Sequence, residues 1–296
     1  MFFQKKPDML GISVGPKTVR LVCLSRQGKK RAVSFCGTCE AAFGEEGFAG
    51  LLHSYLAANS LLGMQAAVSL DDPSMKIRKL ELPEMPEADL KEAVKWKIRD
   101  VLEGPVADYV VRSSLLEKVA TAQAKKLMLV GYAVKRAAVN ALLQKIVAAG
   151  LKVSFVEPSA VSLAAAIEQA YPSSEHWVSG LDLGPKKAIM VIVGQGKLYY
   201  SRWLPGIPEI SDKDPAINQK LAAEVQNTID TFTVNFHVDK IHRIFLSGEE
   251  ATLPGLADYL STNVAVKSEI LNPFRDMEKI PDKPYLYAQA YALAQV

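Results

Sequence analysis

Alternating hydrophobic and polar positions predict two similar groups of strands that lie far apart in the chain. In the second group, apolar residues lead into Gly184, an Ile- and Val-rich run leaves it, and Gly196 turns the chain once more. These features are typical of three strands joined by tight turns over residues 177–203. The first group has the same layout over residues 10–24, with a third strand predicted at 31–38.

The two groups match residue for residue around their first turns. Four residues of the first group align without a gap with four of the second, namely Gly11, Gly15, Pro16 and Lys17 with Gly180, Gly184, Pro185 and Lys186. The distance between the copies is more than half the chain, which excludes a solenoid of short repeats. The chain is therefore expected to contain two related halves.

Helical spacing and short apolar runs predict the elements between and after these groups. Helices are predicted at 45–62, 87–99, 135–149 and 158–170, and strands at 66–70, 75–82, 109–112, 126–132 and 153–157. The order strand, helix, strand, strand, helix over residues 75–150 indicates a compact α+β unit inserted into the first half. The second half continues with a predicted helix at 218–236, a strand at 241–247, extended pieces at 264–266 and 269–271, and a closing helix at 285–295.

Composition and charge narrow the class of protein. The 296 residues are 49% hydrophobic and 23% charged, as in ordinary soluble domains, and the length predicts about two domains. A net charge of +3 is too small to indicate nucleic-acid binding. Cys36 and Cys39 form a C-x-x-C, but no second ligand pair accompanies them, and the four histidines are scattered along the chain. We therefore expect reduced thiols and no metal site.

Neither a secretion signal nor a membrane span is expected. Residues 1–6 place their charges after the apolar side chains, and the apolar core of a signal peptide does not follow. None of the apolar runs reaches the length that crosses a bilayer. The expected location is the cytoplasm.

The two strand–turn–strand groups have the layout of actin-like ATPases. In those proteins two hairpins face each other across a cleft, their backbone N–H groups bind phosphates, and an acidic residue holds the metal or its water. Further motifs follow in order along the chain, among them Leu10-Gly-Ile-Ser-Val-Gly15, Glu81-Leu-Pro-Glu-Met-Pro86, Leu181-Asp-Leu-Gly184, Leu246-Ser-Gly248 and Leu271-Asn-Pro-Phe274. In these motifs the chain resembles the PilM family, the cytoplasmic actin-like component of type IV pilus assembly, and within it the shorter MshI-type relatives.

This resemblance implies an α/β, actin-like (ribonuclease H-like) fold of two halves with an inserted α+β subdomain. The first actin-like subdomain would comprise residues 1–74 and 151–174, the insert 75–150, and the second half 175–296. Most of the extra subdomain that covers the nucleotide in relatives would be missing from the second half. The resemblance also implies a partner, the short amino-terminal cytoplasmic tail of a PilN-like single-pass inner-membrane protein, which the family binds in a groove of the first half.

The nucleotide site implied by the resemblance is degenerate. Its residues would be Ser13, Gly15, Lys17, Asp182, Gly184, Lys186 and Gly248. Family members usually have Asp at position 13 and a second glycine where this chain has Glu249. Pro16 and Pro185 each remove one backbone N–H from a phosphate-binding turn. We therefore expect neither physiological ATP binding nor hydrolysis, and keep ATP with magnesium as the alternative.

The predicted function is a non-enzymatic cytoplasmic scaffold of a type IV, MSHA-like pilus assembly complex. It would bind the PilN-like tail, contact pilus motor or platform proteins, bind no nucleic acid, and reach the inner membrane only through its partner. The tail would pair with a sheet edge between the first-half sheet and the insert. Candidate contact residues are Val68, Leu70, Ile77, Leu80, Leu82, Trp96 and Val130. The alternatives are an ATP-binding switch or weak ATPase in pilus assembly, and the cytoplasmic part of a type II secretion assembly platform.

Overall fold

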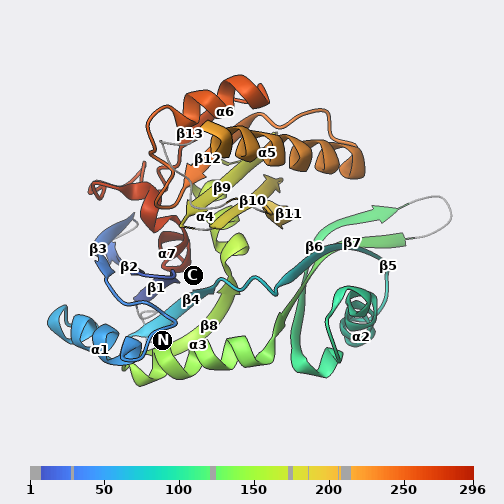
Figure 1. Cartoon of the computed structure of the whole chain (residues 1–296). Helices are drawn as coiled ribbons and strands as arrows, with labels where there is room; N and C mark the ends of the chain where they lie inside the picture. Colours follow the sequence, from blue (N-terminus) through green and yellow to red (C-terminus); the bar gives the residue numbers. More distant parts are fainter. Residues whose placement is uncertain are drawn as a thin grey trace.

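Two five-stranded sheets with the same topology form the body of the molecule (Figure 1). The computed structural model describes residues 8–27, 30–120, 125–172, 176–185, 187–205, 207 and 215–296. The first sheet has the strand order β3-β2-β1-β4-β8, and the second has the order β11-β10-β9-β12-β13. In each sheet the first three strands in sequence form an antiparallel meander, and the other two run parallel to the first strand.

The strand boundaries follow the apolar runs of the sequence. The first sheet consists of β1 (Met9–Val14), β2 (Val19–Gln27), β3 (Lys30–Cys39), β4 (Gln65–Leu70) and β8 (Lys152–Pro158). The second sheet consists of β9 (Val178–Gly184), β10 (Lys187–Gly194), β11 (Lys197–Trp203), β12 (Arg243–Ser247) and β13 (Ser268–Ile270). The repeat predicted from the two glycine turns is therefore confirmed as a repeat of whole sheets.

Each sheet is covered on its inner face by a helix that crosses an aligned glycine. Helix α7 (Ala288–Leu293) crosses Gly11 of β1, and helix α4 (Ser159–Ala170) crosses Gly180 of β9. A Cβ atom at Gly180 would lie 2.3 Å from Cδ1 of Ile167 on α4, so a larger residue there would require the Ile167 side chain to move. The two helices also pack against each other where the halves meet.

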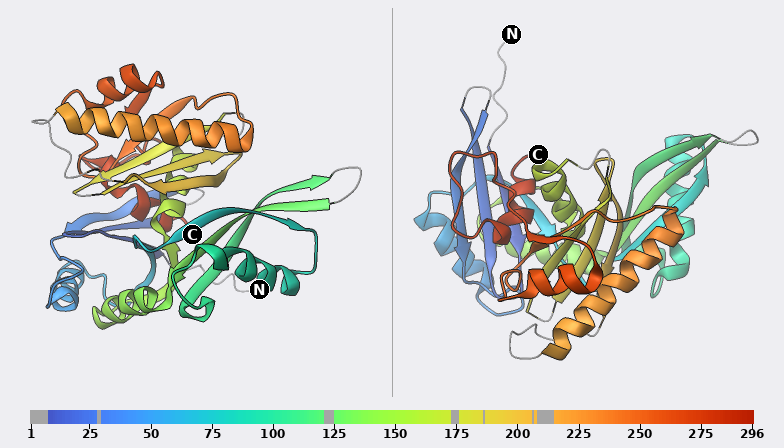
Figure 2. Two further views of the ribbon diagram at one scale, coloured as in Figure 1. Left: turned by 45° about the vertical axis from the view of Figure 1, so that its right-hand side comes forward. Right: turned by 90° about the horizontal axis from the view of Figure 1, so that it is seen from above.

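Four amphipathic helices of the described chain cover the outer faces of the two sheets. Helices α1 (Phe48–Ala58) and α3 (Arg136–Ala148) pack on the first sheet, and α5 (Pro215–Phe236) and α6 (Leu256–Val264) pack on the second. Figure 2 shows α5 lying along the second sheet. In the described part of the chain, no helix has both the length and the apolar character needed to cross a bilayer.

A three-stranded sheet with the order β5-β7-β6 stands beside the two halves. Its elements are β5 (Lys76–Pro83), α2 (Glu87–Ile98), the short 3₁₀ turns η1 (Arg99–Val101) and η2 (Val106–Asp108), β6 (Tyr109–Ala120) and β7 (Lys125–Lys135). Helix α2 packs on one face, against Leu80, Leu82, Leu127 and Leu129. The opposite face, with Ile77 and Val130, packs toward the core of the second half.

The structure differs from the predicted elements at three places. Strand β6 continues to Ala120, well beyond the predicted end at residue 112, because it stays paired with β7 along a hairpin that projects from the body (Figure 2). The extended piece predicted at 264–266 is wrong, since α6 runs to Val264 and Ala265 adopts a left-handed φ of 55°. The closing helix is split into the 3₁₀ turn η3 (Pro284–Tyr287) and α7.

Candidate functional site

The two glycine turns face each other where the halves meet, as the actin-like layout predicts. Ser13 on β1 and Asp182 on β9 occupy equivalent register positions, each beside a serine of the next parallel strand. Both side chains are nearly buried, 9% and 8% exposed. The first turn is closed by a hydrogen bond from the N–H of Gly15 to the carbonyl of Thr18, 2.8 Å long. The predicted acidic and hydroxyl residues are therefore brought together at one site.

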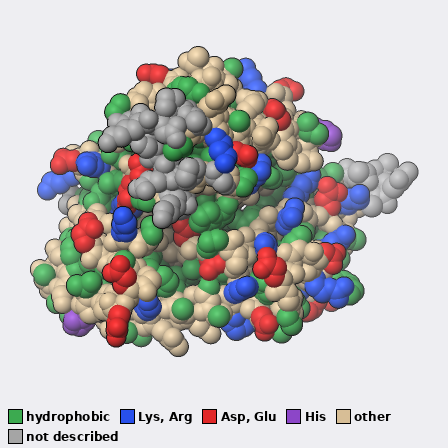
Figure 3. All heavy atoms as spheres, viewed as in Figure 1, with side chains coloured by type: hydrophobic (Ala, Val, Ile, Leu, Met, Phe, Trp, Pro, Cys, Tyr) green, Lys and Arg blue, Asp and Glu red, His purple; other side chains and the backbone are tan. Residues whose placement is uncertain are grey.

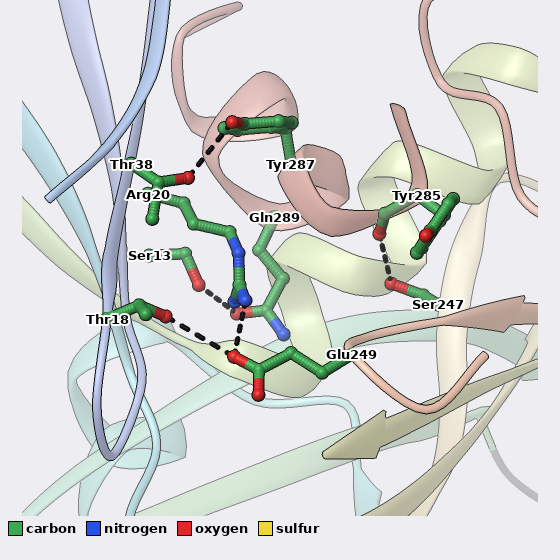
Figure 4. A network of polar contacts seen from close by, with 9 residues as sticks. All are labelled: Ser13, Thr18, Arg20, Thr38, Ser247, Glu249, Tyr285, Tyr287 and Gln289. Atoms are coloured by element: carbon green, nitrogen blue, oxygen red, sulfur yellow. Dashed lines mark hydrogen bonds and ion pairs between the residues drawn. The ribbon is translucent and has the colours of Figure 1, made fainter. Parts of the chain in front are cut away.

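Gln289 of helix α7 bridges these two residues across the site. The hydroxyl of Ser13 donates to Oε1 of Gln289 over 3.1 Å, and Nε2 of Gln289 donates to Oδ2 of Asp182 over 3.0 Å. Figure 4 shows Gln289 pointing from α7 toward Ser13. The buried amide of Gln289 thus contacts the first residue of the predicted phosphate site in each half. Gln289 was not among the site residues predicted from the sequence.

Glu249 makes a second bridge from the other direction. Its Oε1 accepts from Nη2 of Arg20 at 2.5 Å and from the hydroxyl of Thr18 at 3.4 Å. Arg20 and Thr18 belong to the first half, whereas Glu249 follows β12 of the second half, so this ion pair also joins the two halves (Figure 4). The Arg20 side chain is 11% exposed and that of Glu249 is 30% exposed, so the pair is partly shielded from solvent.

Gly248 fixes the loop from which Glu249 extends. It has a φ of 91°, and a Cβ atom there would lie 2.2 Å from the carbonyl oxygen of Leu183 and 2.7 Å from Oδ1 of Asp182. The N–H of Glu250 donates to the same carbonyl of Leu183 over 3.0 Å. The backbone therefore rests on the end of β9, and the neighbouring Glu249 side chain reaches toward the first half.

Little open space remains beside Ser13 and Asp182, although Gly15, Pro16 and Pro185 of the two turns also line a hollow of about 450 Å³. The cavity lined by Ser13, Gly15, Asp182, Gly184 and Gly248 has a volume of about 40 Å³. Pockets that hold small ligands commonly measure about 300–1,000 Å³. Lys17 is exposed and is not part of the cavity wall, and Lys186 lies outside the described residues. In this closed arrangement the residues present do not fit a magnesium–nucleotide complex.

A much larger groove lies between the insert and the second half, with a volume of about 720 Å³. Strand β5 forms one wall and β11 the other, and both are edge strands of their sheets. Two contacts from β11 to β6 hold the walls in place: Nζ of Lys197 donates to the carbonyl of Leu116 over 2.6 Å, and the hydroxyl of Tyr199 donates to Glu117 over 2.7 Å. Figure 3 shows hydrophobic side chains in the hollow of this face.

A second, mainly apolar hollow of about 450 Å³ adjoins this groove. The two share Asp71, Pro73 and Trp203, and the second extends to Phe43 and Leu142 over the first sheet. Its wall includes Ser69, which is 1% exposed and whose hydroxyl makes no hydrogen bond within the described residues. Together the two hollows form a continuous surface along the first half, the insert and the second half.

The predicted partner-binding residues do not lie on one surface. Only Ile77 lines the groove. Leu70 lines the apolar hollow. Four others are core residues with at most 7% exposure: Val68 packs on the first sheet from β4, and the alternation along β5 and β7 turns Leu80, Leu82 and Val130 into the cores on either face of the insert. Trp96 is 62% exposed, but it lies on α2, which covers the face of the insert away from the groove.

The cysteines and histidines form no recognisable metal centre. Cys36 and Cys39 pack against different clusters on opposite faces of the first sheet, and burial raises the pKa of Cys36 to about 12. His176 and His242, far apart in sequence, stack with ring centroids 4.3 Å apart. Burial, followed by the neighbouring His176, lowers the pKa of His242. Across the described ranges, no three potential ligands gather as a metal site would require.

The chain is similar to known proteins both in sequence and in structure. A family model described as type IV pilus assembly protein PilM matches residues 215–294, from α5 to α7. A solved PilM–PilN type IV pilus biogenesis complex contains a chain that superposes with a TM-score of 0.83 at 18% identity, covering 98% of both chains. None of the curated proteins matches the sequence.

More distant structures have the same architecture. The cytoplasmic domain of EpsL, an inner-membrane component of the Vibrio cholerae type II secretion system, gives a TM-score of 0.55 at 14% identity, covering 97% of this chain and 94% of that one. The ethanolamine utilization protein EutJ of Carboxydothermus hydrogenoformans gives 0.53 at 13% identity, covering 98% and 90%. The predicted actin-like fold is confirmed, while its subdomain boundaries and the MshI-type relationship stay predictions. The resemblance of this chain to the PilM family is likewise confirmed.

Proposed function

We propose that this protein is a non-enzymatic scaffold of a type IV pilus assembly complex of the MSHA-like kind. It binds the amino-terminal cytoplasmic tail of a PilN-like inner-membrane protein and so acts at the inner membrane through that partner. The observation that carries the proposal is the open groove of about 720 Å³ between the edge strands β5 and β11, whereas the cavity at Ser13, Asp182 and Gly248 measures about 40 Å³. The molecule thus offers an extended peptide a groove between two strand edges, and leaves little room beside Ser13 and Asp182 of the predicted nucleotide site.

The site between the turns argues against an ATP-driven cycle. Gln289 and Glu249 fill the space that a nucleotide would need, and Pro16 and Pro185 line the same small cavity without an N–H to offer. Phosphates need several cations or N–H donors. Here the described guanidinium nearest the turns, that of Arg20, is already paired with Glu249. ATP with magnesium therefore remains the weaker alternative.

The groove has the chemistry that captures an extended peptide. Its two walls are edge strands, whose outer backbone groups can pair with an added strand while side-chain pockets select the sequence. Ile77 and Trp203 supply apolar surface, and Arg78 is exposed and forms no ion pair among the described residues. A tail with apolar side chains and an acidic flank suits this lining.

The solved relatives support the same partner class. One is a complex named for PilM together with PilN, and another is the cytoplasmic domain of an inner-membrane secretion component. Contacts with pilus motor or platform proteins belong to the proposal as well, because a scaffold must join its tail to the rest of the assembly.

Titration calorimetry tests the proposal. The purified chain is titrated with a synthetic peptide of the cytoplasmic tail of the PilN-like protein from the same genome and, separately, with Mg-ATP after a mass-spectrometric check for co-purified nucleotide. We expect micromolar binding of the peptide and no heat with ATP up to millimolar concentration. Absence of peptide binding would reject the scaffold, and ATP binding abolished by Asp182→Ala would favour the nucleotide switch.

A further inference from the structure

We propose that Glu249 is a built-in substitute for a nucleotide phosphate, which closes the two halves on each other and thereby sets the width of the groove. This inference rests on the proposed function, in which the fold is kept for its surfaces. In an actin-like cleft the first turn meets an anion. Here the anion facing that turn is the carboxylate of Glu249, held by Arg20 and Thr18.

The loop geometry makes Glu249 a rigid arm of the second half. Gly248 lies so close to Leu183 and Asp182 that no side chain fits, and the N–H of Glu250 anchors the loop to Leu183. The loop that bears the Glu249 carboxylate is therefore anchored to the end of β9 and is not free to move. Any opening of the cleft must separate it from Arg20.

Arg20 supplies the energetic reason for closure. Its side chain is 11% exposed, and its Nε is buried without a hydrogen-bond acceptor in the described part of the chain. A shielded guanidinium that loses the carboxylate paired with it is left with an uncompensated charge, which is strongly unfavourable. The free Nε also means that a larger oxyanion, with oxygens for both Nε and Nη2, would satisfy this group better than one carboxylate oxygen does.

The ion pair between Arg20 and Glu249 affects the groove because the groove is lined by residues of the first half, the insert and the second half. Strand β11 moves with the second half, whereas β5 belongs to the insert and Asp71 to the first half. Because Lys197 and Tyr199 hold the insert to β11, a change in the angle between the halves moves the first-half end of the groove, at Asp71, relative to β11. Closure by an internal carboxylate keeps the groove at one width without a bound nucleotide.

Distances between spin labels test the inference without the tail peptide. Labels are placed at Ala58→Cys on α1 and Thr262→Cys on α6, two exposed helix positions of different halves, in a Cys36→Ala background that leaves only buried thiols. Glu249→Lys places a cation beside Arg20 and is expected to lengthen and broaden the distance distribution. Glu249→Gln should do so less, and the exchange Arg20→Glu with Glu249→Lys should restore a narrow distribution. Glu278→Lys, an exposed charge reversal in the same half, is the control and should change nothing.

Inorganic phosphate distinguishes a phosphate substitute from a simple ion pair. Added to Glu249→Ala, millimolar phosphate should narrow the distribution again, whereas the wild type should not respond. A Glu249→Lys distribution identical to that of the wild type would overturn the closure, and a Glu249→Ala variant that opens but ignores phosphate would overturn the substitution. Because no tail is present, failure of peptide binding in the wild type would reject the proposed function while leaving these distances to decide the inference.

Discussion

Gly11 on β1 packs directly beneath the carbonyl group of Ala290 on α7: a Cβ atom at Gly11 would lie 1.9 Å from that oxygen and 2.6 Å from the N–H nitrogen of Ala294. Both neighbours are backbone atoms, so no side chain can rotate away to make room. The carboxy-terminal helix is thus seated on the first strand of the chain through a glycine that the sequence repeat singled out.

Gly11→Ala is therefore expected to destabilise the fold by about 3 kcal/mol, because overpacking against backbone forces the helix to move. Denaturant unfolding followed by circular dichroism measures this loss. Gly50→Ala is the matched control, since Gly50 is exposed on α1 with no atom within 4 Å of its Cβ position. It should be neutral or slightly stabilising. Similar losses for the two variants would contradict the close packing.

The bridge made by Gln289 predicts an energetic coupling between the halves. Gln289→Ala removes a buried donor from Asp182 and an acceptor from Ser13, and is expected to lower the free energy of unfolding by about 1–3 kcal/mol. A double-mutant cycle with Ser13→Ala should give a coupling of about 0.5–1.5 kcal/mol. Additive losses would mean that the 3.1 Å contact contributes nothing.

Glu157 predicts a pH dependence of stability. Burial raises the pKa of Glu157 to about 7 from an ordinary value of 4.5. Between these values the folded chain holds a proton that the unfolded chain has lost, so this residue makes stability fall as pH rises from about 4.5 to 7. Glu157→Gln should remove that fall, gaining at most about 3 kcal/mol relative to wild type between pH 4.5 and 8.

Unfolding curves of both proteins across this pH range check the prediction. Glu278→Gln, which changes an exposed carboxylate, should keep a constant offset from the wild type at every pH. A constant offset for Glu157→Gln as well would show that the Glu157 carboxyl titrates normally.

Substitutions of two tryptophans distinguish tail binding in the groove from tail binding on the surface of α2. Trp203 lines both hollows, whereas Trp96 stacks its ring under the guanidinium of Arg99, 3.7 Å away, on the other side of the insert. Trp203→Ala is expected to weaken binding of the tail peptide about tenfold or more, as for a buried aromatic contact. Trp96→Ala should leave the affinity within about twofold. Calorimetry on variants with unchanged circular dichroism decides, and the reverse ranking would place the tail on α2.

Much of the architecture could be predicted from local sequence patterns. The alignment of Gly11 with Gly180 predicted two related halves, and both residues turn out to be places where a helix crosses a strand. Alternating apolar residues and glycine turns are enough to predict the strands, because the apolar residues of each strand indicate that it is buried. The part of β6 beyond residue 112 escaped prediction for the same reason, since its exposed Ser113 and Ser114 are stabilised by pairing with β7 and not by burial.

The candidate site was only half predictable. Ser13, Asp182 and Gly248 were identified from their turns, but Arg20 was not predicted as a site residue although it lies in the first strand group, and Gln289 comes from a helix without a motif. Gln289, set between alanines in the middle of the predicted closing helix, was the available signal for a buried polar contact. Periodicity also could not sort Leu80 from Ile77, because it shows that both are apolar but not which face of the sheet a helix will cover.

The position of α7 has a consequence for how the chain is made. Ser13 and Gln289 are 276 residues apart, so the inner face of the first sheet waits for its cover until almost all the described sequence has been translated. At about 5–20 residues per second, that wait lasts roughly 15–55 s. During this interval the first sheet exposes apolar surface beside the ribosome, so a nascent chain halted before residue 288 should be a strong client of chaperones and should lack a protected β1.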